Sequence, residues 1–248
     1  MAPIVPDETT FLGLAAREAS ELESPVARAE LYGRIAEGYR AVGDESSMLS
    51  LATTALSLAL SAGSTEESIR AGLPLAPLLA AAGDDALALA ALESALDFAA
   101  ATSDSRLRAD LLPRIVGSAL RSDEPARPIL RRAVDEVYVI EDPEQRAEAL
   151  IRIGELYQTG GAALSVTGLI QQAIPAARSA RGAWRRADLF TRLSALAGST
   201  NEQRLASRLR ENAVVEVDQA VAPQTDDEAE LLVGVIERLA RLDDVENA

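Results

Sequence analysis

The sequence contains no cysteine and no histidine. Without cysteine no disulfide can form, and the redox compartment cannot be inferred from cysteine usage. Without histidine the chain lacks the most common general base and the most common zinc ligand. No phosphate loop, dinucleotide fingerprint, nucleophile elbow or metal-ligand cluster occurs in the remaining residues. We therefore expect no catalytic residue, no metal and no cofactor.

Lysine is also absent, so all 24 basic residues are arginine, and the net charge is −15. No basic run is present that would neutralise nucleic-acid phosphates or bind an anionic membrane surface. No apolar run reaches the roughly 18 residues of a membrane-spanning helix. The start, MAPIVPDETT, is unlike a signal peptide. These features predict a cytoplasmic protein, and a mature exported form that had lost its signal would look the same.

Aromatic residues are scarce, at 3%, although 48% of the chain is apolar. The apolar content is mostly alanine and leucine, which are strong helix formers together with glutamate and arginine. Runs of β-branched or aromatic residues, which are typical of strands, are few. The composition predicts an all-α protein.

An eight-residue phrase, RAELYGRI at Arg28–Ile35, recurs along the chain in related forms. Its spacing is near 40 residues or twice that. The related copies are RADLLPRI from Arg108, RAEALIRI from Arg146 and RADLFTRL from Arg186, with weaker ones from Ser68 and Glu228. This pattern predicts a right-handed α-solenoid of about six helix-turn-helix repeats, because one hairpin cannot bury its apolar faces alone.

Each copy shows signals for two helices. Residues that favour a helix start precede the phrase, as in Ser24-Pro25 and Asp142-Pro143. The first helix is expected to stop at a residue that tolerates the left-handed conformation, namely Gly43, Gly83, Asp123, Gly161, Asn201 and Asp243. A small residue marks the second helix, at Ala55, Ala95, Ala133, Ala173 and Ala213. We expect a disordered or extended segment over 1–9, one repeat domain over 10–243 and a tail over 244–248.

The residues Ile35-Ala36, Tyr39, Gly43 and Ala55 resemble the tetratricopeptide repeat, as do Ile153-Gly154, Tyr157, Gly161 and Ala173. The period near 40 exceeds that family's usual length. The resemblance implies a scaffold that binds proteins or peptides on a concave face lined by the first helices. If that face maps onto this chain, it would contain Glu37, Arg40, Leu73, Pro77, Arg121, Ile151, Glu155 and Thr191. Trp184, the only tryptophan, is a further contact candidate, because tryptophan is enriched at binding hot spots.

Two sets of arginines recur with the phrase. The second set, Arg34, Arg114, Arg152 and Arg192, follows an acidic residue by four positions, which predicts ion pairs within each helix. The alternative is that this set lines a groove and binds carboxylates. The first set, Arg28, Arg108, Arg146 and Arg186, lies in first helical turns, where the helix dipole disfavours a cation. For that set we expect bracing between helices.

Four prolines, Pro74, Pro77, Pro113 and Pro175, fall inside expected helices. Interior proline kinks a helix, so these positions predict curvature in the array or a bend that shapes a groove. The last expected helix, over 226–242, carries a wide apolar stripe that includes Leu231, Val235 and Ile236. Such a stripe predicts self-association through the terminal helices.

The sequence thus predicts a non-catalytic scaffold for a protein or peptide that is basic or inserts apolar side chains. A hydrolase or lyase that uses a carboxylate pair, and a structural subunit of a larger assembly, are the alternatives. A deep pocket with two close, perturbed carboxylates would favour the enzyme, and a long open groove would favour the scaffold.

Overall fold

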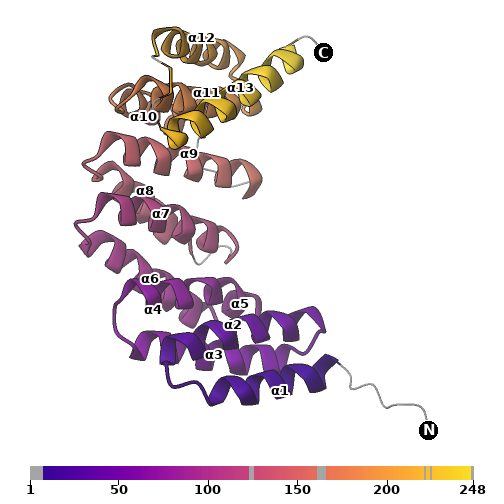
Figure 1. The fold of residues 1–248 in the computed structure, drawn as a ribbon. Helices are drawn as coiled ribbons and strands as arrows, with labels where there is room; N and C mark the ends of the chain where they lie inside the picture. Colours follow the sequence, from indigo (N-terminus) through magenta and orange to yellow (C-terminus); the bar gives the residue numbers. More distant parts are fainter. Residues whose placement is uncertain (1–7, 123–125, 161–165, 221, 224, 247–248) are drawn as a thin grey trace. The chain divides into compact units, whose positions relative to one another are not determined.

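The structure is a computed structural model that describes residues 8–122, 126–160, 166–220, 222–223 and 225–246. The described part of the chain is helical and contains no strand, which confirms the all-α prediction. Most helices are α-helical, and η1 is a single 3₁₀ turn (Figure 1). Their bounds are α1 Glu8–Ser20, α2 Pro25–Ala41, α3 Glu45–Ser61, α4 Glu66–Gly72, η1 Leu73–Leu75, α5 Ala76–Ala81, α6 Asp85–Ala101, α7 Ser105–Leu120, α8 Arg127–Tyr138, α9 Pro143–Gly160, α10 Val166–Arg178, α11 Ala183–Ser199, α12 Gln203–Gln219 and α13 Asp226–Glu246.

The helices start where the sequence places capping residues. The Ser24 hydroxyl accepts a hydrogen bond from the Ala27 amide at the start of α2. Asp142 does the same for the Glu144 and Gln145 amides at the start of α9. These side chains satisfy amide groups that have no partner inside the helix. The starts of α11 and α12 differ, because Gly182 precedes α11, Glu202 precedes α12, and neither start has a side-chain cap.

The predicted stops are confirmed at Gly43, Gly83 and Asn201, which all have positive φ values of 79°, 80° and 62°. The next residue is the N-cap of the second helix: the carboxylate of Asp44, for example, accepts a hydrogen bond from the Ser47 amide at the start of α3. That hydrogen bond lowers the pKa of Asp44 below its ordinary value. A left-handed residue followed by a cap reverses the chain in the fewest residues.

One predicted stop is wrong. Asp243 lies inside α13, which continues to Glu246. Aspartate tolerates the left-handed conformation but does not require it, so a helix continues through it where no glycine follows. The expected stops at Asp123 and Gly161 lie outside the described residues.

The first helix of the second copy is broken into α4, η1 and α5. Pro74 lies at the start of η1 and Pro77 at the start of α5, where the missing amide hydrogen costs least. The predicted distortion is therefore found at these two prolines. Pro113 and Pro175, by contrast, remain inside α7 and α10.

The helices group into two compact units. The first comprises residues 1–102 and 114–133, and the second residues 103–113 and 134–248. In the first unit α2 packs against α3 as a hairpin, and α2 also contacts α4. In the second unit α9 packs against α10, α11 against α12, and α11 contacts both α9 and α13 (Figure 1). First helices of successive copies therefore lie against each other within a unit. The solenoid, its period and the single domain remain predictions.

Small residues allow the helices to approach closely. The five marker alanines of the second helices are each at most 1% exposed, as expected for a packing position. A Cβ added to Gly154 of α9 would lie 2.5 Å from Leu196 Cδ2 of α11. A Cβ added to Gly38 of α2 would lie 2.6 Å from Leu12 Cδ2 of α1. Real Cβ atoms do not approach this closely, so these glycines set the spacing of neighbouring helices.

Candidate functional site: a charged groove on the first helices

An open groove of ≈ 850 Å³ lies in the second unit, on the face formed by α9, α11 and the start of α13. Most of its lining is charged, with arginines and carboxylates intermixed, and Trp184 and Leu231 supply the apolar part. The charged lining residues are Arg106, Glu144, Glu148, Arg152, Arg181, Arg185, Asp188, Asp227, Glu228, Glu230 and Arg238.

Arg185 of α11 contacts three carboxylates at once. Its Nε lies 2.9 Å from Glu144 Oε1, its Nη2 3.2 Å from Glu148 Oε2 and its Nη1 3.4 Å from Asp188 Oδ2. Glu144 and Glu148 lie on successive turns of α9, so the guanidinium of Arg185 joins α11 to α9. The planar fork of arginine suits this arrangement, since it offers five donors in fixed directions.

Arg192, two turns further along α11, makes the second connection to α9. Its Nη1 lies 2.7 Å from Glu148 Oε1 and its Nη2 3.1 Å from Glu155 Oε1. Arg152 of α9 in turn lies 3.6 Å from Asp110 of α7 and 3.9 Å from Glu148. An acid of one copy of the phrase is thus paired with an arginine of the next copy.

Arg238 connects α13 to α11. Its Nη2 forms an ion pair with Asp188, whose side chain is only 6% exposed, and its Nε donates to Thr191 Oγ1 at 3.2 Å. A Cβ on Gly234 would lie 3.1 Å from Arg238 Nη2. The glycine therefore leaves room for the guanidinium to fold back along its own helix.

This network holds Glu148 in its charged form. Burial by itself would raise the pKa of Glu148, but the charge and hydrogen bond of Arg192, together with Arg185 and Arg152, outweigh burial and lower it below 4.5. Glu148 is therefore ionised at neutral pH and has no proton to donate. The same pairing raises the pKa of Arg192 above its ordinary value despite burial.

The predicted pairing within helices is only partly correct. Arg152 lies near Glu148 of its own helix, but Arg192 pairs with Glu148 and Glu155 of α9 rather than with Asp188. Asp188 instead contacts Arg185 and Arg238. The same acid-to-arginine spacing that allows a pair within one helix also places these side chains on the face that meets the adjacent copy. For Arg192, ion pairs with Glu148 and Glu155 of the neighbouring helix therefore replace the expected pair with Asp188 of its own helix.

The first arginine set braces helices, as expected, at two positions. Arg146 Nη1 donates to the Ile140 carbonyl at 2.9 Å, and Arg186 Nη1 donates to the Ala180 carbonyl at 3.2 Å. Both carbonyls follow the preceding second helix, where the helix dipole favours a cation. Arg186 also lies 2.7 Å from Glu216 of α12. Arg28 differs, because its Nε is buried and has no hydrogen-bond partner among the described residues.

The residues predicted for the concave face fall into two groups. In the first unit Glu37, Arg40 and Arg121 are exposed, Pro77 is half-buried and Leu73 is buried.

In the second unit Trp184 lines the groove, Glu155 pairs with Arg192 beside it, and Thr191 is buried under Arg238. Ile151 is fully buried. The second unit therefore brings Glu155, Trp184 and Thr191 to one region. The residues that dominate the groove, Arg185, Arg238, Glu144 and Glu148, were not predicted as site residues. The recurrence of acid and arginine in each copy was the available signal.

The apolar stripe of α13 is covered only in part. Val235 is fully buried against the unit, whereas Val233 and Ile236 are 56% and 54% exposed. Self-association through this helix stays a prediction.

No group of three or more potential metal ligands occurs in the described part of the chain. A search of the described helices for a segment able to span a bilayer finds none. Comparison with protein-family models yields no match, and comparison with curated proteins yields none either.

Proposed function

We propose that the chain is a non-catalytic scaffold, a right-handed α-solenoid of the tetratricopeptide-like kind, that binds a protein or peptide segment in the groove of α9, α11 and α13. The observation that carries this proposal is the groove itself, which is open and lies on the first helices. Its floor is held rigid by the pairing of Arg185, Arg192 and Arg238 with carboxylates. A preorganised surface loses little entropy when a partner binds.

The charges at the rim indicate the chemistry of the partner. Asp227 and Glu230, on the first turns of α13, are exposed and line the groove. The net charge of the chain is −15. A basic segment that crosses α13 would therefore be attracted to this rim, with Trp184 of the groove lining as an apolar contact.

The carboxylate-based hydrolase or lyase is less well supported. Such an enzyme needs a carboxylic acid that keeps its proton near neutral pH, which requires a raised pKa. The pKa of Glu148, the carboxylate shared by three arginines, is lowered instead. A carboxylate paired with arginines in this way stabilises the contact between helices, and it has no proton to donate as a general acid.

The test is a screen of arrayed peptides with the labelled full chain, followed by calorimetry on the strongest basic peptide. Asp227→Asn combined with Glu230→Gln should weaken binding about tenfold, by roughly 0.7 kcal/mol for each rim charge. Glu93→Gln combined with Glu211→Gln is the matched control, because it removes the same charge from exposed positions outside the groove lining. The control should bind as the parent does.

The affinity for a basic peptide should also fall as salt is raised, because exposed charges are screened. Equal binding by the rim variant and the control would contradict the groove as the site. An affinity that stays flat from low to high salt would contradict the electrostatic part of the proposal.

A further inference from the structure

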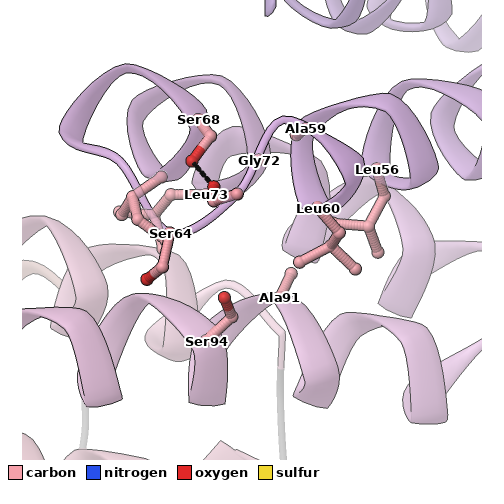
Figure 2. A pocket seen from close by; sticks show the side chains of 11 residues that line it. Leu56, Ala59, Leu60, Ser64, Ser68, Gly72, Leu73, Ala91 and Ser94 are labelled. Carbon is pink, nitrogen blue, oxygen red and sulfur yellow. Dashed lines mark hydrogen bonds between the residues drawn. The ribbon is translucent and has the colours of Figure 1, made fainter.

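A second, smaller pocket lies in the first unit, between α3, the start of α4 and α6. Figure 2 shows this pocket from close by. Its volume is ≈ 140 Å³. No charged side chain lines it. The lining residues are Leu56, Ala59, Leu60, Gly63, Ser64, Ser68, Ile69, Gly72, Leu73, Ala91 and Ser94.

Small residues from different helices create this space. Ala59 of α3 and Ala91 of α6 are buried at the pocket wall, and Gly72 ends α4 just before the 3₁₀ turn. Gly63 has a φ of 89° and reverses the chain between α3 and α4. A side chain on Gly72 would point toward Ala59 Cβ and Leu56 Cδ1, both 3.6 Å from an added Cβ. The pocket is thus a consequence of residues without bulk at a helix junction.

Three serine hydroxyls line the pocket, and they differ in whether they form hydrogen bonds within the chain. Ser68 is buried, and its hydroxyl bridges the Gly63 carbonyl and the Thr65 amide, so it is satisfied within the chain. The hydroxyls of Ser64 and Ser94 form no hydrogen bond with any other described residue, and neither side chain is buried. In Figure 2 Ser64 and Ser94 lie at one end of the pocket, and Leu56 and Leu60 lie at the other. One end of the pocket is therefore apolar and the other offers two hydroxyls.

Size and chemistry together select the occupant. A cavity of roughly 150 Å³ lined by aliphatic side chains holds one benzene-sized molecule. The absence of any charged lining residue makes a charged guest unfavourable, because its desolvation would not be offset. Two free hydroxyls can donate to and accept from a single hydroxyl of the guest.

From these observations we propose that the pocket binds a small uncharged ring or branched chain of about six carbon atoms that carries one hydroxyl group. The ring lies against Leu56, Ala59 and Gly72, and its hydroxyl lies between Ser64 and Ser94. This site is separate from the groove of the proposed function and does not depend on it.

The test uses phenol and toluene as probes with the full chain, whose leucine and isoleucine methyl groups are labelled for NMR. Phenol should shift the methyl signals of Leu56, Leu60 and Leu73 and leave those of the second unit in place. Toluene has similar size but no hydroxyl, so it should shift the same signals with weaker affinity, by about three- to tenfold.

Two variants separate the apolar and polar contributions. Gly72→Ala adds a methyl group at ordinary contact distance, so the chain still folds, and phenol binding should weaken about tenfold. Ser94→Ala should reduce the affinity for phenol toward that for toluene, because only the Ser64 hydroxyl then remains, and it should leave toluene binding unchanged. Ser57→Ala, an exposed α3 position outside the pocket, is the control and should change neither.

Three outcomes would overturn the proposal. Unchanged phenol binding in Gly72→Ala would place the ligand elsewhere. No localised shift with either probe up to its solubility would show that the pocket holds only water. Broadening of the same methyl signals with protein concentration, in the absence of a probe, would assign the pocket to a side chain of a second copy.

Discussion

At the scale of single residues, Tyr157 is buried without a partner for its hydroxyl. Its side chain is 2% exposed, and no hydrogen bond to the oxygen is found among the described residues. The ring fills the core, whereas the unpaired hydroxyl loses its hydration without compensation. Tyr157→Phe should therefore raise the free energy of unfolding by about 1 kcal/mol, measured by urea denaturation at neutral pH. A loss of stability would show that the hydroxyl has a partner.

The same tyrosine should make the protein sensitive to alkali. Burial raises the pKa of Tyr157 from 10.0 to about 12, so the folded state holds its proton more tightly than the unfolded state. The stability linked to this proton is complete below pH 10 and is lost as the pH rises toward 12, by roughly 2–3 kcal/mol in all. In Tyr157→Phe this part of the alkaline loss should be absent. Identical alkaline profiles would contradict the assignment.

Glu148 gives the opposite pH dependence. Its pKa is lowered below 4.5, so its contribution to stability is present above that value and is lost as the pH falls through the folded-state pKa. Glu148→Gln should lower the free energy of unfolding by about 1–2 kcal/mol at pH 7, since Arg185 and Arg192 keep their other carboxylates. The difference between the variant and the parent should shrink in acid.

Glu155 is the control for that measurement. It pairs with the same Arg192, but its side chain is 47% exposed, and exposed pairs contribute only about 0.2–1 kcal/mol. Glu155→Gln should therefore cost less than Glu148→Gln. Equal effects would mean that the two pairs are equally screened by solvent.

At the scale of helices, the contact of α9 with α11 depends on the missing side chain of Gly154. Alanine is normally a better helix residue than glycine by about 0.5–1 kcal/mol. Here an added Cβ would lie 2.5 Å from Leu196, which is 3% exposed and cannot move freely. Gly154→Ala should therefore lower the free energy of unfolding by about 1–3 kcal/mol in urea denaturation.

A double-mutant cycle and a control locate the effect. Gly198→Ala, in α11, meets no atom closer than 4.0 Å and should be neutral or stabilising. Leu196→Ala removes the clashing methyl groups and leaves a cavity. Adding Gly154→Ala to it should cost nothing further, because the methyl then fills vacant space. Additive losses would show that the close contact is not the cause.

At the scale of the whole molecule, the arginine–carboxylate network belongs to the second compact unit. Its contacts run between α9, α11 and α13. In arrays of stacked helices, stability is close to a sum of nearest-neighbour terms. Gly154→Ala should therefore reduce hydrogen-exchange protection of α9 and α11 about tenfold or more and leave α2 and α3 unchanged. Equal loss of protection in both units would mean that the described chain unfolds as one cooperative unit.

The sequence by itself determined the helices and most of their ends. The signals are local: Ser24 and Asp142 cap helices through amides two or three residues away, and Gly43 reverses the chain within its own turn. Such interactions need no knowledge of the fold. The prediction of a helix end failed at Asp243, because aspartate tolerates the left-handed conformation that ends a helix but does not require it.

Only the tertiary structure decided which charges meet. Arg192 is 44 residues from Glu148 and Arg238 is 50 from Asp188, while nearer partners lie on the same helices. The sequence shows that acids and arginines recur, but it does not show whether a side chain pairs along its helix or across to the next. That choice depends on how closely the helices approach, which Gly154 and the buried alanines set. The groove and the small pocket follow from the same approach, because both are spaces left between side chains that only packing brings together.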